Sequence, residues 1–139
     1  MTTTTILIIA DKENKLNYSF FSLEGERIEI YPFESAIEKI RHCTADIILI
    51  DSGFDVEKGL NLLIESKRTC HNIPIIFLTS ASSEDVVERA FKLGAREYIK
   101  KPFDLADLQN IVKNILYIKR SSKEKRTPYI SKITSSEIL

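Results

Sequence analysis

The chain has 139 residues, 43% of them hydrophobic, and its 20 basic residues balance its 20 acidic residues. This length suits one domain that buries roughly two-thirds of its unfolded surface, and the neutral balance gives no reason to expect direct binding of nucleic acid or of an anionic membrane. The apolar runs are far shorter than the roughly 20 residues that span a bilayer, and the start Met-Thr-Thr-Thr-Thr lacks the basic residues of a signal peptide. We therefore expect a cytosolic protein.

The first half of the chain alternates between strand-like and helix-like patterns. Residues 6–9 form a continuous apolar run, as expected of a strand covered on both faces, and residues 14–23 suit a short helix. Residues 27–31 alternate like an edge strand and stop at a proline. Helical spacing of apolar residues follows over 34–43, and a second continuous apolar run predicts a strand over 47–50.

The second half continues this alternation. We expect, in order, a helix over 57–68, a strand over 75–78, a helix between a serine cap (Ser82 or Ser83) and Gly94, a strand over 97–99, and a last helix capped by Asp104. Five strands alternating with five helices predict an α/β protein, a three-layer sandwich in which right-handed crossovers join the strands of a parallel sheet.

The alternation stops near the carboxyl end of the sequence. Residues 120–128 are charged and interrupted, as linkers are, and residues 130–139 resume an apolar rhythm that is too short to build a domain. We interpret residues 1–119 as one domain and residues 120–139 as a linker or the start of an output region that continues in a longer protein.

Three residues of complementary chemistry fall at the ends of predicted strands: Asp51, Thr79 and Lys101. Parallel α/β sheets place their chemistry at the carboxyl edge, so these side chains are expected to meet there. A carboxylate can accept a phosphoryl group, a hydroxyl can hydrogen-bond to its oxygens, and an ammonium can offset its charge. The pattern therefore predicts a phosphate site.

Taken with their spacing, several motifs resemble the receiver domain of bacterial two-component response regulators. They are Asp11 after the first strand, Asp51 after the third with Gly59 beyond it, Thr79-Ser80-Ala81 after the fourth, and Tyr98 with Lys101-Pro102-Phe103 around the end of the fifth. The resemblance implies a flavodoxin-like sheet of order 2-1-3-4-5. It also implies a signalling domain rather than a conventional metabolic enzyme.

The resemblance further implies a role for each matching position. Asp51 would accept phosphate from a sensor histidine kinase or a phosphotransfer protein, and Mg²⁺ would be held by Asp11, Asp51 and the main-chain carbonyl of Gly53. The peptide before the proline of the Lys-Pro-Phe motif would be cis, which aims Lys101 inward. Thr79 and Tyr98 would form the switch that alters the surface of the fourth helix, fifth strand and fifth helix, where a homodimer could also form.

The sequence departs from the family at the acidic pocket. Receiver domains usually carry two adjacent acids after the first strand, whereas this chain has Ala10-Asp11-Lys12, so one acid is missing. We expect weakened magnesium binding, and a Lys12 ammonium could occupy the place of the metal. Lys58 also stands where the family often has an acid. These departures favour an alternative, a pseudo-receiver that acts as a protein-interaction module without taking phosphate.

Two further interpretations have less support. A flavodoxin-like nucleotide or flavin binder would share the strand order, but the turn after the first strand has no glycine. A zinc site at His42-Cys43 and Cys70-His71 would need ligands from spaced positions, whereas adjacent side chains diverge. We expect Cys43 and Cys70 to be helix-end residues in a reducing compartment.

Overall fold

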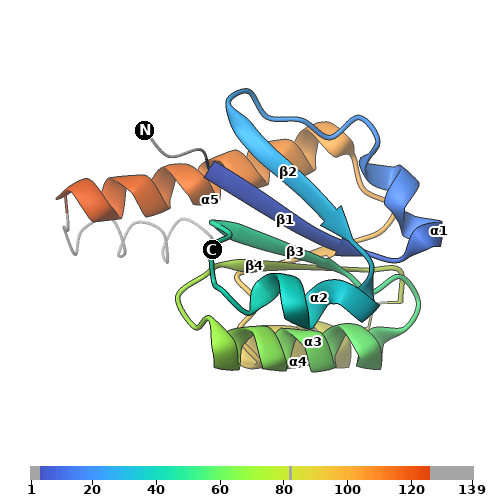
Figure 1. Ribbon diagram of the computed structural model, residues 1–139. Helices are drawn as coiled ribbons and strands as arrows, with labels where there is room; N and C mark the ends of the chain where they lie inside the picture. Colours follow the sequence, from blue (N-terminus) through green and yellow to red (C-terminus); the bar gives the residue numbers. More distant parts are fainter. Residues whose placement is uncertain (1–3, 82, 126–139) are drawn as a thin grey trace.

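The computed structural model of the protein describes residues 4–81 and 83–125. Five parallel strands form one sheet in the order β2-β1-β3-β4-β5, which confirms the predicted topology (Figure 1). In chain order the elements are β1 (Thr4–Ala10), α1 (Lys12–Lys15), the short 3₁₀ helix η1 (Leu16–Tyr18), β2 (Glu26–Tyr31), α2 (Phe33–Ile40), β3 (Ile47–Asp51), α3 (Val56–Thr69), β4 (Ile75–Thr79), α4 (Glu84–Lys92), β5 (Glu97–Lys100) and α5 (Leu105–Lys125).

Helices cover both faces of the sheet and create two hydrophobic cores. Successive strand residues point to opposite faces, so Leu7 and Ile9 of β1 pack beneath α2, α3 and α4, whereas Ile6 and Ile8 pack against η1 and α5. Figure 1 shows this three-layer arrangement. The three central strands are covered on both sides, which explains why their sequences are continuous apolar runs rather than alternating ones.

Three helices differ from their predicted bounds. The first helical segment begins at Lys12 and ends at Tyr18, instead of covering 14–23, and α2 ends at Ile40. The last helix continues to Lys125 without the predicted break near Arg120, because residues 120–125 contain neither proline nor glycine. The remainder of the predicted linker and output region, residues 126–139, lies outside the described residues. No helix in the described part of the chain is both long and apolar enough to cross a membrane.

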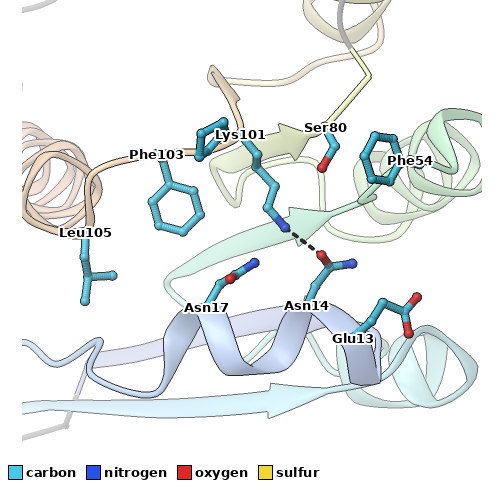
Figure 2. Close-up of a pocket in the computed structure, with 9 residues that line it drawn as sticks. Glu13, Asn14, Asn17, Phe54, Ser80, Lys101, Phe103 and Leu105 are labelled. Carbon is cyan, nitrogen blue, oxygen red and sulfur yellow. Dashed lines mark hydrogen bonds between the residues drawn. The ribbon is translucent and has the colours of Figure 1, made fainter.

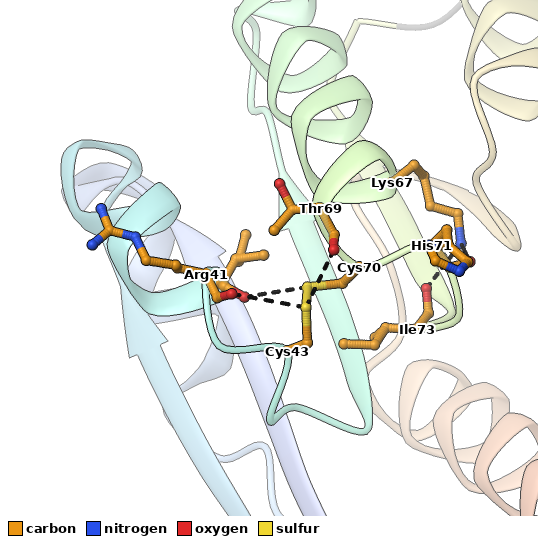
Figure 3. The surroundings of a disulfide bond; sticks show 8 residues. Arg41, Cys43, Lys67, Thr69, Cys70, His71 and Ile73 are labelled. Carbon is orange, nitrogen blue, oxygen red and sulfur yellow. Dashed lines mark hydrogen bonds between the residues drawn. A yellow bond between two sulfur atoms is a disulfide. The ribbon is translucent and has the colours of Figure 1, made fainter.

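The two cysteines lie at helix ends, as expected, but they are paired with each other, so the expectation of free thiols is wrong for this structure. A disulfide joins Cys43, which follows α2, to Cys70, the residue that caps the end of α3 (Figure 3). The bond closes a loop of sequence separation 27. In the chain-entropy model a loop of this length stabilises the fold by roughly 3 to 4 kcal/mol.

Candidate functional site

Asp51 ends β3 and its side chain is fully buried, with 0% exposure. Its Oδ2 accepts hydrogen bonds from the Lys101 ammonium and the Tyr18 hydroxyl, each at 2.8 Å, and its Oδ1 accepts one from the Gly53 backbone N–H at 2.9 Å. These three donors offset the cost of removing a carboxylate from water. Because each carboxylate oxygen has two lone pairs, Oδ2 is saturated, whereas Oδ1 keeps one free lone pair.

Thr79 lies at the end of the neighbouring strand, β4, but its hydroxyl bonds to main-chain groups rather than to Asp51. Its Oγ1 lies 3.1 Å from the carbonyl oxygens of Gly53 and Ala81, to either of which it can donate, and it accepts from the Ala81 N–H at 3.2 Å. The Gly53 carbonyl also accepts the backbone N–H of Ser80 at 2.7 Å. The loop after Asp51 is therefore fastened to the end of β4.

Gly53 is required for the shape of this loop. Its φ is +58°, in the left-handed region, and a Cβ at this position would lie 2.7 Å from Asn14 Nδ2. The missing side chain lets α1 approach the loop closely.

Asp11, the residue after β1, is held by two donors. Its Oδ2 is paired with the Lys58 ammonium from the first turn of α3, and its Oδ1 accepts the backbone N–H of Phe33 at 3.3 Å. The pKa of Lys58 is raised, chiefly by this hydrogen bond to Asp11. Lys12, the lysine whose ammonium was expected to be able to occupy the place of the metal, is exposed instead.

Asn14 and Tyr18 also belong to the site, although no sequence motif predicted a role for either of them. They are four residues apart along the first helical segment, a spacing that places side chains on one face. Asn14 accepts a hydrogen bond from Lys101 at 2.7 Å, so one lysine bridges Asn14 and Asp51. Burial, followed by the Asp51 carboxylate, raises the pKa of the Tyr18 phenol, which therefore stays protonated and donates.

An open pocket lies beside this network. Its volume is about 480 Å³, and it is lined by side chains of α1, the loop after β3 and the segment around Pro102. Figure 2 shows the Lys101 ammonium reaching toward Asn14, with Phe54 and Ser80 on the same rim. The peptide bond between Lys101 and Pro102 is cis, as the resemblance implied.

Residues 6–113 match the family model described as the response regulator receiver domain. The chain belongs to this family. Receiver domains are generally signalling domains, and the family implies signal transduction through a phosphoaccepting residue.

Relatives with curated descriptions are longer than this receiver chain. The transcriptional regulatory protein RprY of Bacteroides fragilis is 30% identical over 125 residues, which cover 88% of this chain and 53% of RprY. The heme response regulator HssR of Staphylococcus aureus is 32% identical over 105 residues, which cover 73% of this chain and 46% of HssR. The chain thus spans about half the length of these relatives.

Solved structures show the same fold. A CheY-like receiver domain protein from Methanospirillum hungatei superposes with a TM-score of 0.74 at 24% identity, covering 88% of this chain and 99% of that one. A two-component response regulator from Clostridium difficile gives a TM-score of 0.71 at 30% identity, covering 82% of this chain and 96% of that one.

The predicted switch tyrosine of this receiver domain, Tyr98, lies on β5 and packs against the core beneath α3 and α4. Its hydroxyl is buried and has no hydrogen-bond partner among the described residues. An unpaired buried hydroxyl costs free energy. If the Tyr98 ring adopted another orientation in which its hydroxyl formed a hydrogen bond, this free-energy cost would be removed.

Receiver domains typically bind Mg²⁺ at the acidic pocket, and at two of the three residues expected to hold it here, Asp11 and Gly53, the oxygens are already engaged. Both oxygens of Asp11 accept hydrogen bonds, and the Gly53 carbonyl accepts the Ser80 N–H and lies within hydrogen-bond distance of the Thr79 hydroxyl. Within the described ranges there is no group of three or more His, Cys, Asp or Glu placed to hold a metal. As they lie, these groups do not fit a divalent ion, and the magnesium site at Asp11, Asp51 and Gly53 stays a prediction.

Proposed function

We propose that this receiver domain accepts a phosphoryl group on Asp51 from a sensor histidine kinase or a phosphotransfer protein. The observation that carries the proposal is the buried Asp51 carboxylate, held 2.8 Å from the Lys101 ammonium at the end of a central parallel strand. A lone buried carboxylate would be costly, and this one is paired with a cation that can also offset the charge of an incoming phosphoryl group. Thr79 and Ser80, at the end of the next strand, carry hydroxyl groups at the same edge of the sheet.

In the proposed step the free lone pair on Asp51 Oδ1 attacks the phosphorus atom. A phosphorus–oxygen bond forms to the carboxylate while the bond from phosphorus to the donor's histidine nitrogen breaks. That nitrogen keeps the electron pair, and the proton already on the other ring nitrogen makes the leaving imidazole neutral. Lys101 stays beside Oδ2 and stabilises the negative charge near the product. No other co-reactant is needed for the atoms and charges to balance.

Phosphorylation would then act on the switch. The Thr79 hydroxyl exchanges the Gly53 carbonyl for a phosphoryl oxygen, and this differential contact allows Tyr98 to move and alters the surface formed by α4, β5 and α5. Such a change would be transmitted to an output region beyond residue 119, or to a second copy of the chain that binds the same surface. We place this signalling in the cytoplasm. The half-length coverage of RprY and HssR supports the idea of a separate output region.

The direct test is phosphorylation by a small acyl phosphate, followed by intact mass measurement. We expect one phosphoryl group on the parent and none on Asp51→Asn, while Asp107→Asn, at an exposed position on α5, is modified like the parent. Equal labelling of Asp51→Asn would show that another residue is the acceptor. No labelling of the parent would reject the proposal.

Tyr18→Phe should phosphorylate faster than the parent. The Tyr18 hydroxyl donates to the reacting carboxylate, and hydrogen bonds to charged groups contribute about 1.5 kcal/mol or more. If all of that stabilisation of the ground state is lost, the rate rises by roughly tenfold or more. The measurement is the initial rate with an acyl phosphate, with Tyr117→Phe as the control because Tyr117 is 68% exposed. A slower Tyr18→Phe would mean that the phenol assists the transfer.

The second candidate is a pseudo-receiver, an interaction module that takes no phosphate. The complete burial of Asp51 and the pairing of Asp11 with Lys58 favour it, because both carboxylates are satisfied without phosphate. The labelling experiment separates the two functions.

A further inference from the structure

The acidic pocket contains a second cation, Lys58, that the proposed phosphoryl transfer does not use. Asp51 and Asp11 each bind one ammonium, from Lys101 and Lys58 respectively. The formal charges of these two pairs cancel. The Glu13 and Asp55 carboxylates also act on the Lys58 ammonium, so the remaining negative charge around it favours keeping Lys58 in the pocket.

Lys58 is fixed in this position by its surroundings. Its backbone N–H donates to the Asp55 carboxylate that caps α3, at 3.1 Å, and its ammonium lies 4.7 Å from the centre of the Phe33 ring. An ammonium in the first turn of a helix meets the unfavourable end of the helix dipole, and the Asp11 carboxylate compensates for this. The ring adds a cation–π contact.

The other potential metal ligands are also displaced or missing. Ala10 pairs in register with Asp51 across β1 and β3, so a methyl group stands next to the phosphoacceptor strand end. The Gly53 carbonyl faces Ser80 and Thr79. A divalent ion would therefore have to displace Lys58, detach the loop from β4 and bind with one acid fewer than the family usually offers.

We infer that Lys58 is the resident cation of this pocket and takes the place that a divalent ion has in other receiver domains. Its ammonium neutralises Asp11 and repels a second cation, so phosphoryl transfer to Asp51 runs without one. The expected effect on the phosphorylation rate rests on the proposed function, whereas the expected effect on Mg²⁺ binding does not. Lys101 then offsets charge at the acceptor, while Lys58 keeps Asp11 from adding repulsion toward an anionic phosphodonor.

The test compares the parent with Lys58→Met, which keeps an unbranched apolar stem against Phe33 and removes the charge. Lys12→Met is the matched control, because Lys12 adjoins Asp11 in the sequence and is exposed. Lys58→Gln is the second variant, and urea unfolding verifies that each protein folds. Two readouts are used: calorimetric titration with Mg²⁺, and the phosphorylation rate with an acyl phosphate in Mg²⁺ or in EDTA.

We expect Mg²⁺ binding by the parent and by Lys12→Met to be too weak to saturate in the titration. Lys58→Met and Lys58→Gln should bind Mg²⁺ saturably, with a Kd at least tenfold below the highest concentration used for the parent. The parent's rate should be the same in Mg²⁺ and in EDTA, whereas the rate of Lys58→Met should fall at least tenfold in EDTA. Saturable Mg²⁺ binding by the parent, a parent rate that collapses in EDTA, or Lys58 variants that bind no better would each overturn the inference. A parent that is never phosphorylated rejects the proposed function, and the titration still decides the role of Lys58.

Discussion

Replacing Lys101 with methionine is expected to lower the free energy of unfolding by about 3 kcal/mol and to abolish phosphorylation. The variant leaves the Asp51 carboxylate fully buried, with only Tyr18 and the Gly53 N–H as donors. Removing one partner of a buried ion pair typically costs about 3 to 5 kcal/mol, and the two remaining hydrogen bonds place this case at the lower end. The loss of phosphorylation follows because no other ammonium contacts Asp51 within the described part of the chain.

The control is the adjacent lysine. Lys100 is exposed, and Lys100→Met should change stability by less than about 0.5 kcal/mol. Urea unfolding measures both variants, and the acyl phosphate assay measures acceptor activity. Matching unfolding midpoints for the two variants would show that the pair with Asp51 adds nothing to the stability of the fold.

Gly59→Ala is expected to destabilise the protein by about 2 kcal/mol. Gly59 is a buried residue of α3, and a Cβ there would overlap Ser52 Cβ and lie 2.9 Å from Cε1 of the Phe77 ring. Because the overlap with Ser52 Cβ is severe, we place the overpacking cost at the upper end of its usual range, about 3 kcal/mol, which exceeds the gain of about 1 kcal/mol that alanine brings to a helix interior. Since Ser52 follows Asp51, the displaced loop should also slow phosphorylation.

Thermal unfolding tests this prediction. For a domain of this size the expected loss corresponds to a decrease in Tm of roughly 6 to 10 °C. Asn61→Ala, at an exposed position of the same helix, is the control and should leave Tm nearly unchanged or slightly raised. A Gly59→Ala protein that is more stable than the parent would mean that Ser52 and Phe77 move apart without cost.

The sequence predicts the sheet well because each central strand is a continuous apolar run and each helix carries its own apolar spacing. Asp51, Thr79 and Lys101 could be placed at one edge for the same reason: strand ends follow from local pattern and from topology. Periodicity alone does not determine which side chains pair across the fold. Tyr18 meets Asp51 from 33 residues away, and Lys58 meets Asp11 from 47 residues away.

The error in the predicted bounds of the first helix has the same cause, because contacts across the fold are not visible in the local sequence. Its predicted range followed from local composition, whereas its observed course places Asn14 against Lys101 and Tyr18 against Asp51. The cysteine pairing does not follow from the local sequence, in which each cysteine adjoins a histidine, because the disulfide joins the ends of two different helices. Contacts of this kind are set by tertiary structure.

The disulfide closes a covalent ring that contains part of the pocket. The ring closed by Cys43 and Cys70 contains β3 and all of α3, so Asp51 and Lys58 lie inside it, while their partners Lys101 and Asp11 lie outside. Each ion pair therefore ties the ring to the rest of the chain. A single cut in the exposed turn at Phe54 would leave one molecule, with both halves of the nicked loop still anchored by the cross-link and by one charge pair each.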